Sequence, residues 1–128
     1  MSTEEDNQFN DPNNMNFALT NSRSLMPKIH AVIDYFDHLH LSFMMITETW
    51  LKNLSLLKLS SDLKLGHGLE IIAKNRPMKK GNIELNGGGA AIIFDPSKIH
   101  LKPLSLKKNN HEIVAATGKL PNLSLIHI

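Results

Sequence analysis

An uncharged apolar run, residues 41–46, is the feature that most constrains how this chain of 128 residues can fold. Five of its six residues are large and apolar, and residues 47–50 then read Thr-Glu-Thr-Trp. The run is too short to cross a membrane, and it suits a strand that is buried on both faces of a sheet. In open α/β folds, ligands and metals gather at the carboxyl ends of such strands. Glu48 is therefore the first candidate site residue, and a solvated glutamate at a strand end is the alternative.

The residues before this run predict a second strand that lies parallel to it. Residues 16–20 suit a short strand, and residues 27–40 predict an amphipathic helix because apolar side chains recur there at helical spacing. A strand, helix, strand order favours a parallel pair joined by a right-handed crossover. Asn21 and Glu48 would then both follow the carboxyl ends of their strands, and we expect them to face one pocket.

The rest of the chain predicts a loop and then a β-meander. Residues 51–65 show no clean period and are expected to form a loop. A triple glycine at residues 87–89 precedes a tightly packed strand, and it is interpreted as a turn because a phosphate-binding glycine loop would lead into a helix. The strands expected in this half are residues 69–74, 90–94, 99–106 and 111–116.

Composition limits the possible functions. The chain has no cysteine, which excludes disulfides and thiolate metal sites. Residues 1–15 are acidic and polar, and we expect a disordered tail there without a site. The first sixteen residues hold four acidic side chains and no basic one, so the remainder has fourteen basic against eight acidic residues, a net charge of +6. This excess suits weak binding to a phosphate backbone, and it is also common in soluble domains without such a partner.

The residue types that remain favour magnesium rather than a soft metal. His38 and His40 project about 200° apart on a helix and are poorly placed to ligate one ion together. The sequence contains neither a serine-hydrolase elbow nor a Walker loop. Glu48 and Asn21 offer hard oxygen atoms, and Mg²⁺ takes only one or two protein carboxylates while keeping several waters. The pair is half of a phosphoryl-transfer site.

Three short motifs, taken in order, resemble a known family. Residues 21–25 read NSRSL, residues 46–51 read ITETWL, and residues 87–92 read GGGAAI. Together they resemble the opening of the endonuclease/exonuclease/phosphatase superfamily, and most closely the apurinic-endonuclease-like domain of non-LTR (LINE-type) retrotransposons. The resemblance covers about residues 16–122. It implies the N-terminal half of a four-layer α/β sandwich with a mixed sheet and one crossover helix.

The family resemblance also implies roles for individual residues. Glu48 would ligate the catalytic Mg²⁺, and Asn21 would sit beside it and contact a metal-bound water or the phosphate. Trp50 would pack under the metal loop. Many relatives carry an Asp-Arg pair before the triple glycine, and here residues 75–76 read Asn-Arg, so Arg76 is the candidate for a contact with the DNA substrate.

By the same resemblance, the parent protein would nick target DNA inside the cell, acting in the nucleus, and would carry a reverse transcriptase downstream. A D-x-N motif, a further Asp and an Asp-His pair of the family are absent from this chain, so we expect it to be inactive alone and to expose apolar side chains on the inner face of its sheet. Residues 123–128 are similar to a translated sequencing-adapter end and are expected to be non-native, the alternative being a genuine strand.

Two other functions stay open on the sequence. One is a phosphatase of the same superfamily that acts on a small-molecule or lipid phosphate, which would share Glu48. The other is a non-catalytic, basic nucleic-acid-binding module, in which Glu48 is only a strand-end residue. DNA binding that depends on salt but not on Mg²⁺ or Glu48 would favour the module.

Overall fold

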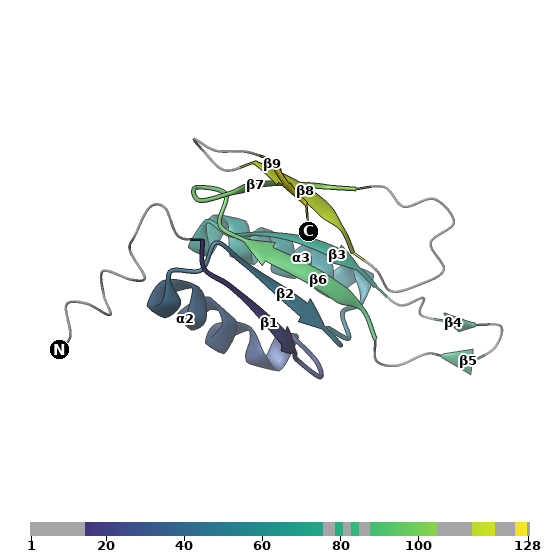
Figure 1. The fold of residues 1–128 in the computed structure, drawn as a ribbon. Helices are drawn as coiled ribbons and strands as arrows, with labels where there is room; N and C mark the ends of the chain where they lie inside the picture. Colours follow the sequence, from purple (N-terminus) through teal and green to yellow (C-terminus); the bar gives the residue numbers. More distant parts are fainter. Residues whose placement is uncertain are drawn as a thin grey trace.

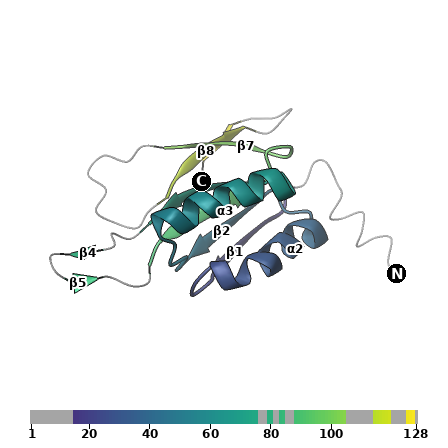
Figure 2. The same cartoon turned by 180° about the vertical axis from the view of Figure 1, so that it is seen from behind.

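The structure is a computed structural model, and it describes residues 15–75, 79–80, 83–84, 88–104, 114–119 and 125–127. A four-stranded mixed sheet forms the centre, with two helices on one face and a smaller sheet on the other (Figures 1 and 2). Neither helix is long and apolar enough to cross a bilayer, a statement that covers the described residues only. The central sheet contains β1 (Phe17–Asn21), β2 (Phe43–Thr47), β3 (Glu70–Lys74) and β6 (Ala90–Phe94).

The first crossover has the predicted form. Strands β1 and β2 are parallel neighbours, and the chain between them forms η1 (Met26–Lys28) and α2 (Ile29–Leu39). Helix α2 buries the apolar stripe that its sequence predicts, through Val32, Ile33 and Phe36. It ends at His40, which adopts the left-handed conformation with φ of 51°. The parallel pair therefore brings the carboxyl ends of β1 and β2 to the same edge of the sheet.

Strand β6 makes the sheet mixed. The strand order is β1-β2-β6-β3, and β6 runs antiparallel to both β2 and β3. Every residue of β6 is buried, which its small and β-branched sequence AAIIF allows. The carboxyl end of β2 consequently meets the amino end of β6, so that the segment after β2 and the glycines before β6 become neighbours.

Residues 53–67 form a second helix, so the prediction of a loop in this region was wrong. Helix α3 (Asn53–His67) leads from β2 to β3, which is a second crossover beside the one expected. Leu59 and Leu63 are buried against the sheet, whereas Leu54, Leu57 and Leu65 are 69–84% exposed. Leucines on both the inner and the outer side of the helix hide the single apolar stripe on which helix prediction depends.

A second sheet covers part of the central one. It has the order β7-β8-β9, formed by β7 (His100–Pro103), β8 (Ala116–Lys119) and β9 (Leu125–His127). Of the expected 99–106 strand, residues 99 and 104 are not in a strand and residues 105–106 lie outside the described residues. Strand β8 begins at the last residue of the expected 111–116 strand, since residues 114–115 are not in a strand and residues 111–113 lie outside the described residues. Strand β9 lies in the segment predicted to be non-native, and its pairing with β8 does not test where that segment comes from. The two-residue strands β4 (Lys79–Lys80) and β5 (Ile83–Glu84) form a separate pair.

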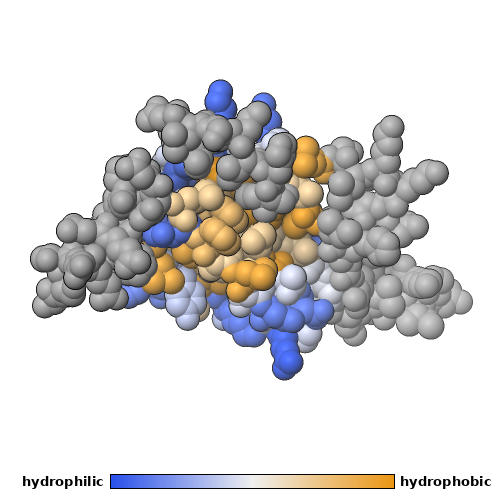
Figure 3. Space-filling view, in the orientation of Figure 1, coloured by the Kyte–Doolittle hydropathy of each residue, from blue (hydrophilic) through white to orange (hydrophobic). Residues whose placement is uncertain are grey.

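The inner face of the central sheet is largely covered, contrary to the prediction that it is exposed. Phe43, Ile92 and Phe94 lie on this face and pack with Ile99, Leu101 and Ala116 in one buried cluster. On edge strand β1 the expected exposure remains, since Phe17 is 55% and Leu19 is 69% exposed. Figure 3 shows apolar residues gathered in the middle of this face.

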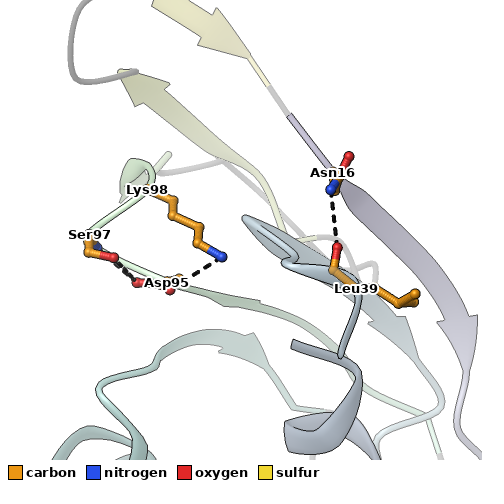
Figure 4. Close-up of polar contacts among 5 residues, drawn as sticks. All are labelled: Asn16, Leu39, Asp95, Ser97 and Lys98. Carbon is orange, nitrogen blue, oxygen red and sulfur yellow. Dashed lines mark hydrogen bonds and ion pairs between the residues drawn. The ribbon is translucent and has the colours of Figure 1, made fainter. Parts of the chain in front are cut away.

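Two polar anchors fix the ends of the central strands (Figure 4). The side-chain amide of Asn16 donates to the carbonyl of Leu39 at 3.1 Å, which holds the start of β1 against the end of α2. After β6, Asp95 accepts hydrogen bonds from the backbone N–H of Ser97 at 2.9 Å and from its hydroxyl at 2.7 Å. Lys98 lies 4.0 Å from the same carboxylate. This turn carries the chain from the central sheet to the second one.

The structure predicts opposite outcomes for two leucines of α3. Leu63→Ala removes a side chain that is 1% exposed, and it should lower the free energy of unfolding by about 2–5 kcal/mol. Leu65→Ala, at a position that is 84% exposed, should change it by no more than about 0.5 kcal/mol. Urea denaturation followed by circular dichroism measures both, and equal effects of the two substitutions would show that α3 does not pack as described.

Candidate functional site

The segment after β2 is bonded on one side to the loop that follows β1. The carbonyl of Glu48 accepts from the backbone N–H of Ser24 at 2.8 Å and from the hydroxyl of Ser22 at 3.0 Å. The carbonyl of Thr49 accepts from the backbone N–H of Leu25 at 2.9 Å. The NSRSL and TETWL motifs, which are about 25 residues apart in sequence, are therefore in direct contact.

On its other side the same segment is bonded to the glycines before β6. The backbone N–H of Trp50 donates to the carbonyl of Gly88 at 2.8 Å, and that of Thr49 donates to the carbonyl of Gly89 at 3.3 Å. Gly87 lies outside the described residues. All three motifs thus meet at one edge of the sheet, with Glu48 in the middle segment.

Gly89 is required at its position for two reasons. Its φ is 88°, a conformation that glycine adopts readily and other residues rarely. A Cβ atom added there would lie 2.5 Å from Oγ1 of Thr49, which is closer than real Cβ contacts. Thr49 is buried, and its hydroxyl has no hydrogen-bond partner within the described part of the chain. Gly89 thus permits a close approach of β6 to the Glu48 segment, in agreement with the tightly packed strand that the sequence predicts after the glycines.

The backbone around Glu48 is unusual. Glu48 and Trp50 have φ of 55° and 54°, and Arg23 and Ser24 in the facing loop have φ of 45° and 83°. Positive φ is uncommon for residues other than glycine and costs roughly 1–3 kcal/mol where it is forced. Such residues persist only where the surrounding structure holds them in place, and they are found most often at binding and catalytic sites. Here the hydrogen bonds from the two neighbouring loops hold them.

The carboxylate of Glu48 is hydrogen-bonded to the indole of Trp50. Nε1 of Trp50 donates to Oε2 of Glu48 at 2.8 Å. Trp50 is 46% exposed, so its ring is only partly covered, and the packing under the metal loop that the family resemblance implied stays a prediction. The sequence alone does not indicate this contact, since it shows only that one residue, Thr49, separates the acid from the indole. Whether they meet depends on the turn of the backbone between them.

Asn21 and Glu48 lie at the same edge of the sheet, as the parallel crossover predicted, and the expectation that their side chains face one pocket stays a prediction. Asn21 is the last residue of β1, and its register partner on β2 is Thr47, the residue before Glu48. Its side chain is exposed, and Oδ1 accepts from the backbone N–H of Arg23 at 3.3 Å. The ammonium of Lys28 donates to the carbonyls of Ser22 and Arg23, which ties the loop to η1.

The candidate substrate contact of Arg76 cannot be placed, because this residue lies outside the described residues. Its neighbour Asn75 donates from Nδ2 to Oδ1 of Asn53 at 3.3 Å, so it bonds to the first residue of α3.

The side-chain oxygen atoms at this edge of the sheet are of the type that binds hard cations. Glu48, which is partly buried, contributes a carboxylate, and Asn21, which is exposed, contributes a carboxamide. Mg²⁺ prefers such oxygen ligands and retains several waters. In the described part of the chain, no three His, Cys, Asp or Glu side chains are grouped so that they could hold a metal ion. A single carboxylate beside a carboxamide is the kind of ligand set that Mg²⁺ accepts while it keeps several waters.

Comparison with known proteins identifies the fold. No protein-family model and no curated protein matches the sequence. A 3′ phosphatase from Neisseria bound to a product DNA hairpin matches with a TM-score of 0.57 and 14% identity, over 84% of this chain and 38% of that one. An AP endonuclease from Archaeoglobus fulgidus matches with a TM-score of 0.56 and 15% identity, again over 84% and 38%. A 3′–5′ exonuclease from Neisseria meningitidis gives 0.52 and 13%, over 80% and 36%.

These similarities confirm the predicted α/β fold with a mixed sheet, which is the fold of AP endonucleases and exonucleases. The chain spans less than two-fifths of the length of each structure it matches. At 13–15% identity they show the fold alone. The roles of Asn21, Glu48 and Arg76, the dependence on Mg²⁺ and the retrotransposon origin stay predictions.

The close approach of Gly89 to Thr49 can be tested with a pair of glycine substitutions. Gly89→Ala should lower the free energy of unfolding by about 2 kcal/mol or more, because it combines a positive φ with a steric clash. Gly66→Ala is the control: it lies in α3 with open space around it, and it should stabilise the protein by about 0.5–1 kcal/mol. Chemical denaturation measures both.

A second variant separates the clash from the backbone strain. In Thr49→Ala the atom that Gly89→Ala would meet is absent, so the double variant should lose less stability than the two single effects added together. Strict additivity would contradict the packing described.

Proposed function

We propose that this chain is the part of a Mg²⁺-dependent phosphodiesterase that carries its metal ligand, Glu48. The observation that supports the proposal is the direct backbone bonding of the NSRSL, TETWL and glycine segments around this one carboxylate. A solvated glutamate at a strand end would need no such support from two other loops. The fold similarity to DNA nucleases and phosphatases supports a reaction of this class.

In this mechanism the protein residues place charge and hydrogen-bonding groups at a phosphate. Glu48 would hold the cation, with Asn21 beside it to orient a water or a phosphate oxygen. The bound cation would neutralise the negative charge that develops on the phosphate oxygens. Arg23 is exposed in the same loop and adds positive charge near the place where a phosphate backbone would approach.

The remaining parts of the reaction are assigned to the parent protein. Because the matched structures are much longer than the chain, we propose that the water-activating base and further contacts lie in the portion of the parent that has no counterpart here. The resemblance of the three motifs supports target DNA as the substrate, and a retrotransposon protein with a downstream reverse transcriptase as the parent. The isolated chain is then inactive.

Nicking of supercoiled plasmid by the parent protein tests the assignment. Glu48→Ala should reduce the Mg²⁺-dependent rate by about 100-fold or more, because the cation loses its protein carboxylate. Glu70→Ala is the matched control, since Glu70 starts β3 at the opposite end of the sheet and should leave the rate unchanged. Wild-type nicking by the Glu48→Ala variant would refute the proposal.

Removal of a terminal phosphate is the second candidate reaction, and a specific observation favours it: one matched structure is a 3′ phosphatase bound to its DNA product. The same Glu48 would serve both reactions. The parent protein should be offered plasmid and a hairpin with a 3′ phosphate in parallel, since the preferred substrate distinguishes an endonuclease from a phosphatase.

A further inference from the structure

Trp50 lies where it can control the orientation of the candidate metal ligand. Its indole Nε1 donates to Oε2 of Glu48 at 2.8 Å, and a hydrogen bond to an ionised acceptor is among the stronger kinds. One oxygen of the carboxylate is thereby engaged, and Oε1 remains for another partner. A carboxylate that is held in this way presents one oxygen in a defined direction.

The position of Trp50 is itself fixed by the fold. Its backbone N–H donates to the carbonyl of Gly88 at 2.8 Å, and its φ is 54°. The residue between them, Thr49, is buried and bonded to both neighbouring loops. The acid and the indole therefore project from one turn, whose backbone is hydrogen-bonded to both neighbouring loops.

The exposure of Trp50 indicates that the indole is not there as part of the core. The ring is 46% exposed, and it belongs to neither of the two buried apolar clusters. A leucine or phenylalanine would cover the same surface without a polar atom, and only the N–H group of an indole bonds the carboxylate.

We propose that Trp50 is a positioning residue, which holds the Glu48 carboxylate so that a single oxygen atom is directed at the divalent cation. This inference rests on the proposed function, because it assumes that Glu48 is a metal ligand. Hydrogen-bonding groups behind metal ligands typically raise metal affinity by about 10–100-fold. Loss of the indole N–H should weaken cation binding while the fold is kept.

The chain contains one tryptophan, so a single indole ¹H–¹⁵N resonance reports on this contact without any activity measurement. In Glu48→Gln this resonance should move, since the charged acceptor is replaced by a neutral one. Addition of Mg²⁺ should move it in the wild type and leave it in place in Glu48→Gln. An indole resonance that ignores both changes would overturn the inference.

The affinity of the protein for Mg²⁺ provides a second test. Trp50→Phe should raise the Kd for Mg²⁺, measured from backbone amide shifts of the Glu48 segment, by about 10-fold. Tyr35→Phe is the control, because it removes a polar group from another exposed ring, on α2. If Mg²⁺ shifts these amides only when Glu48 is present, and Trp50→Phe leaves the Kd for Mg²⁺ unchanged, this inference is overturned and the proposed function is not. No Mg²⁺ response at any amide would overturn the proposed function as well.

Discussion

The backbone hydrogen bonds that reach the Glu48–Trp50 segment from both sides are the interactions on which the site depends. Each is worth only about 1 kcal/mol net, but together they hold two residues with positive φ that would otherwise relax. The approach is close because Gly89 has no side chain to meet Thr49. The sheet supplies the geometry, since parallel β1 and antiparallel β6 place a loop on each side of the end of β2.

Local sequence patterns correctly predicted a strand that is buried on both faces, β2, and a helix that is buried on one face, α2. The run at residues 41–46 predicted β2 because it is apolar and uncharged, and the stripe of α2 predicted a helix because it has a clear helical period. The order of these elements gave the parallel crossover. Helix α3 was missed because Leu54 and Leu65 face solvent and obscure the stripe made by Leu59 and Leu63. The covering of the inner face by β7 and β8 was missed for another reason: it arises from contacts between distant segments, which no local pattern contains.

The site was predictable in outline and not in detail. Topology alone placed Asn21 and Glu48 at one edge, because carboxyl ends of parallel neighbours meet there. The bond from Trp50 to Glu48 depends on φ values that the flanking loops impose, so the sequence could not indicate it. The same holds for Gly89, whose role follows from a neighbour 40 residues earlier in the chain.

Native-state hydrogen exchange tests most directly whether the three loops form one rigid unit. The backbone amides of Ser24, Leu25 and Trp50 donate across the loops, and they should exchange as slowly as the paired amides of β2. Their exchange should require an opening of the same free energy as that of the sheet. If these three amides exchange rapidly while β2 stays protected, the loops are not bonded as described and Glu48 is not held in a preformed site.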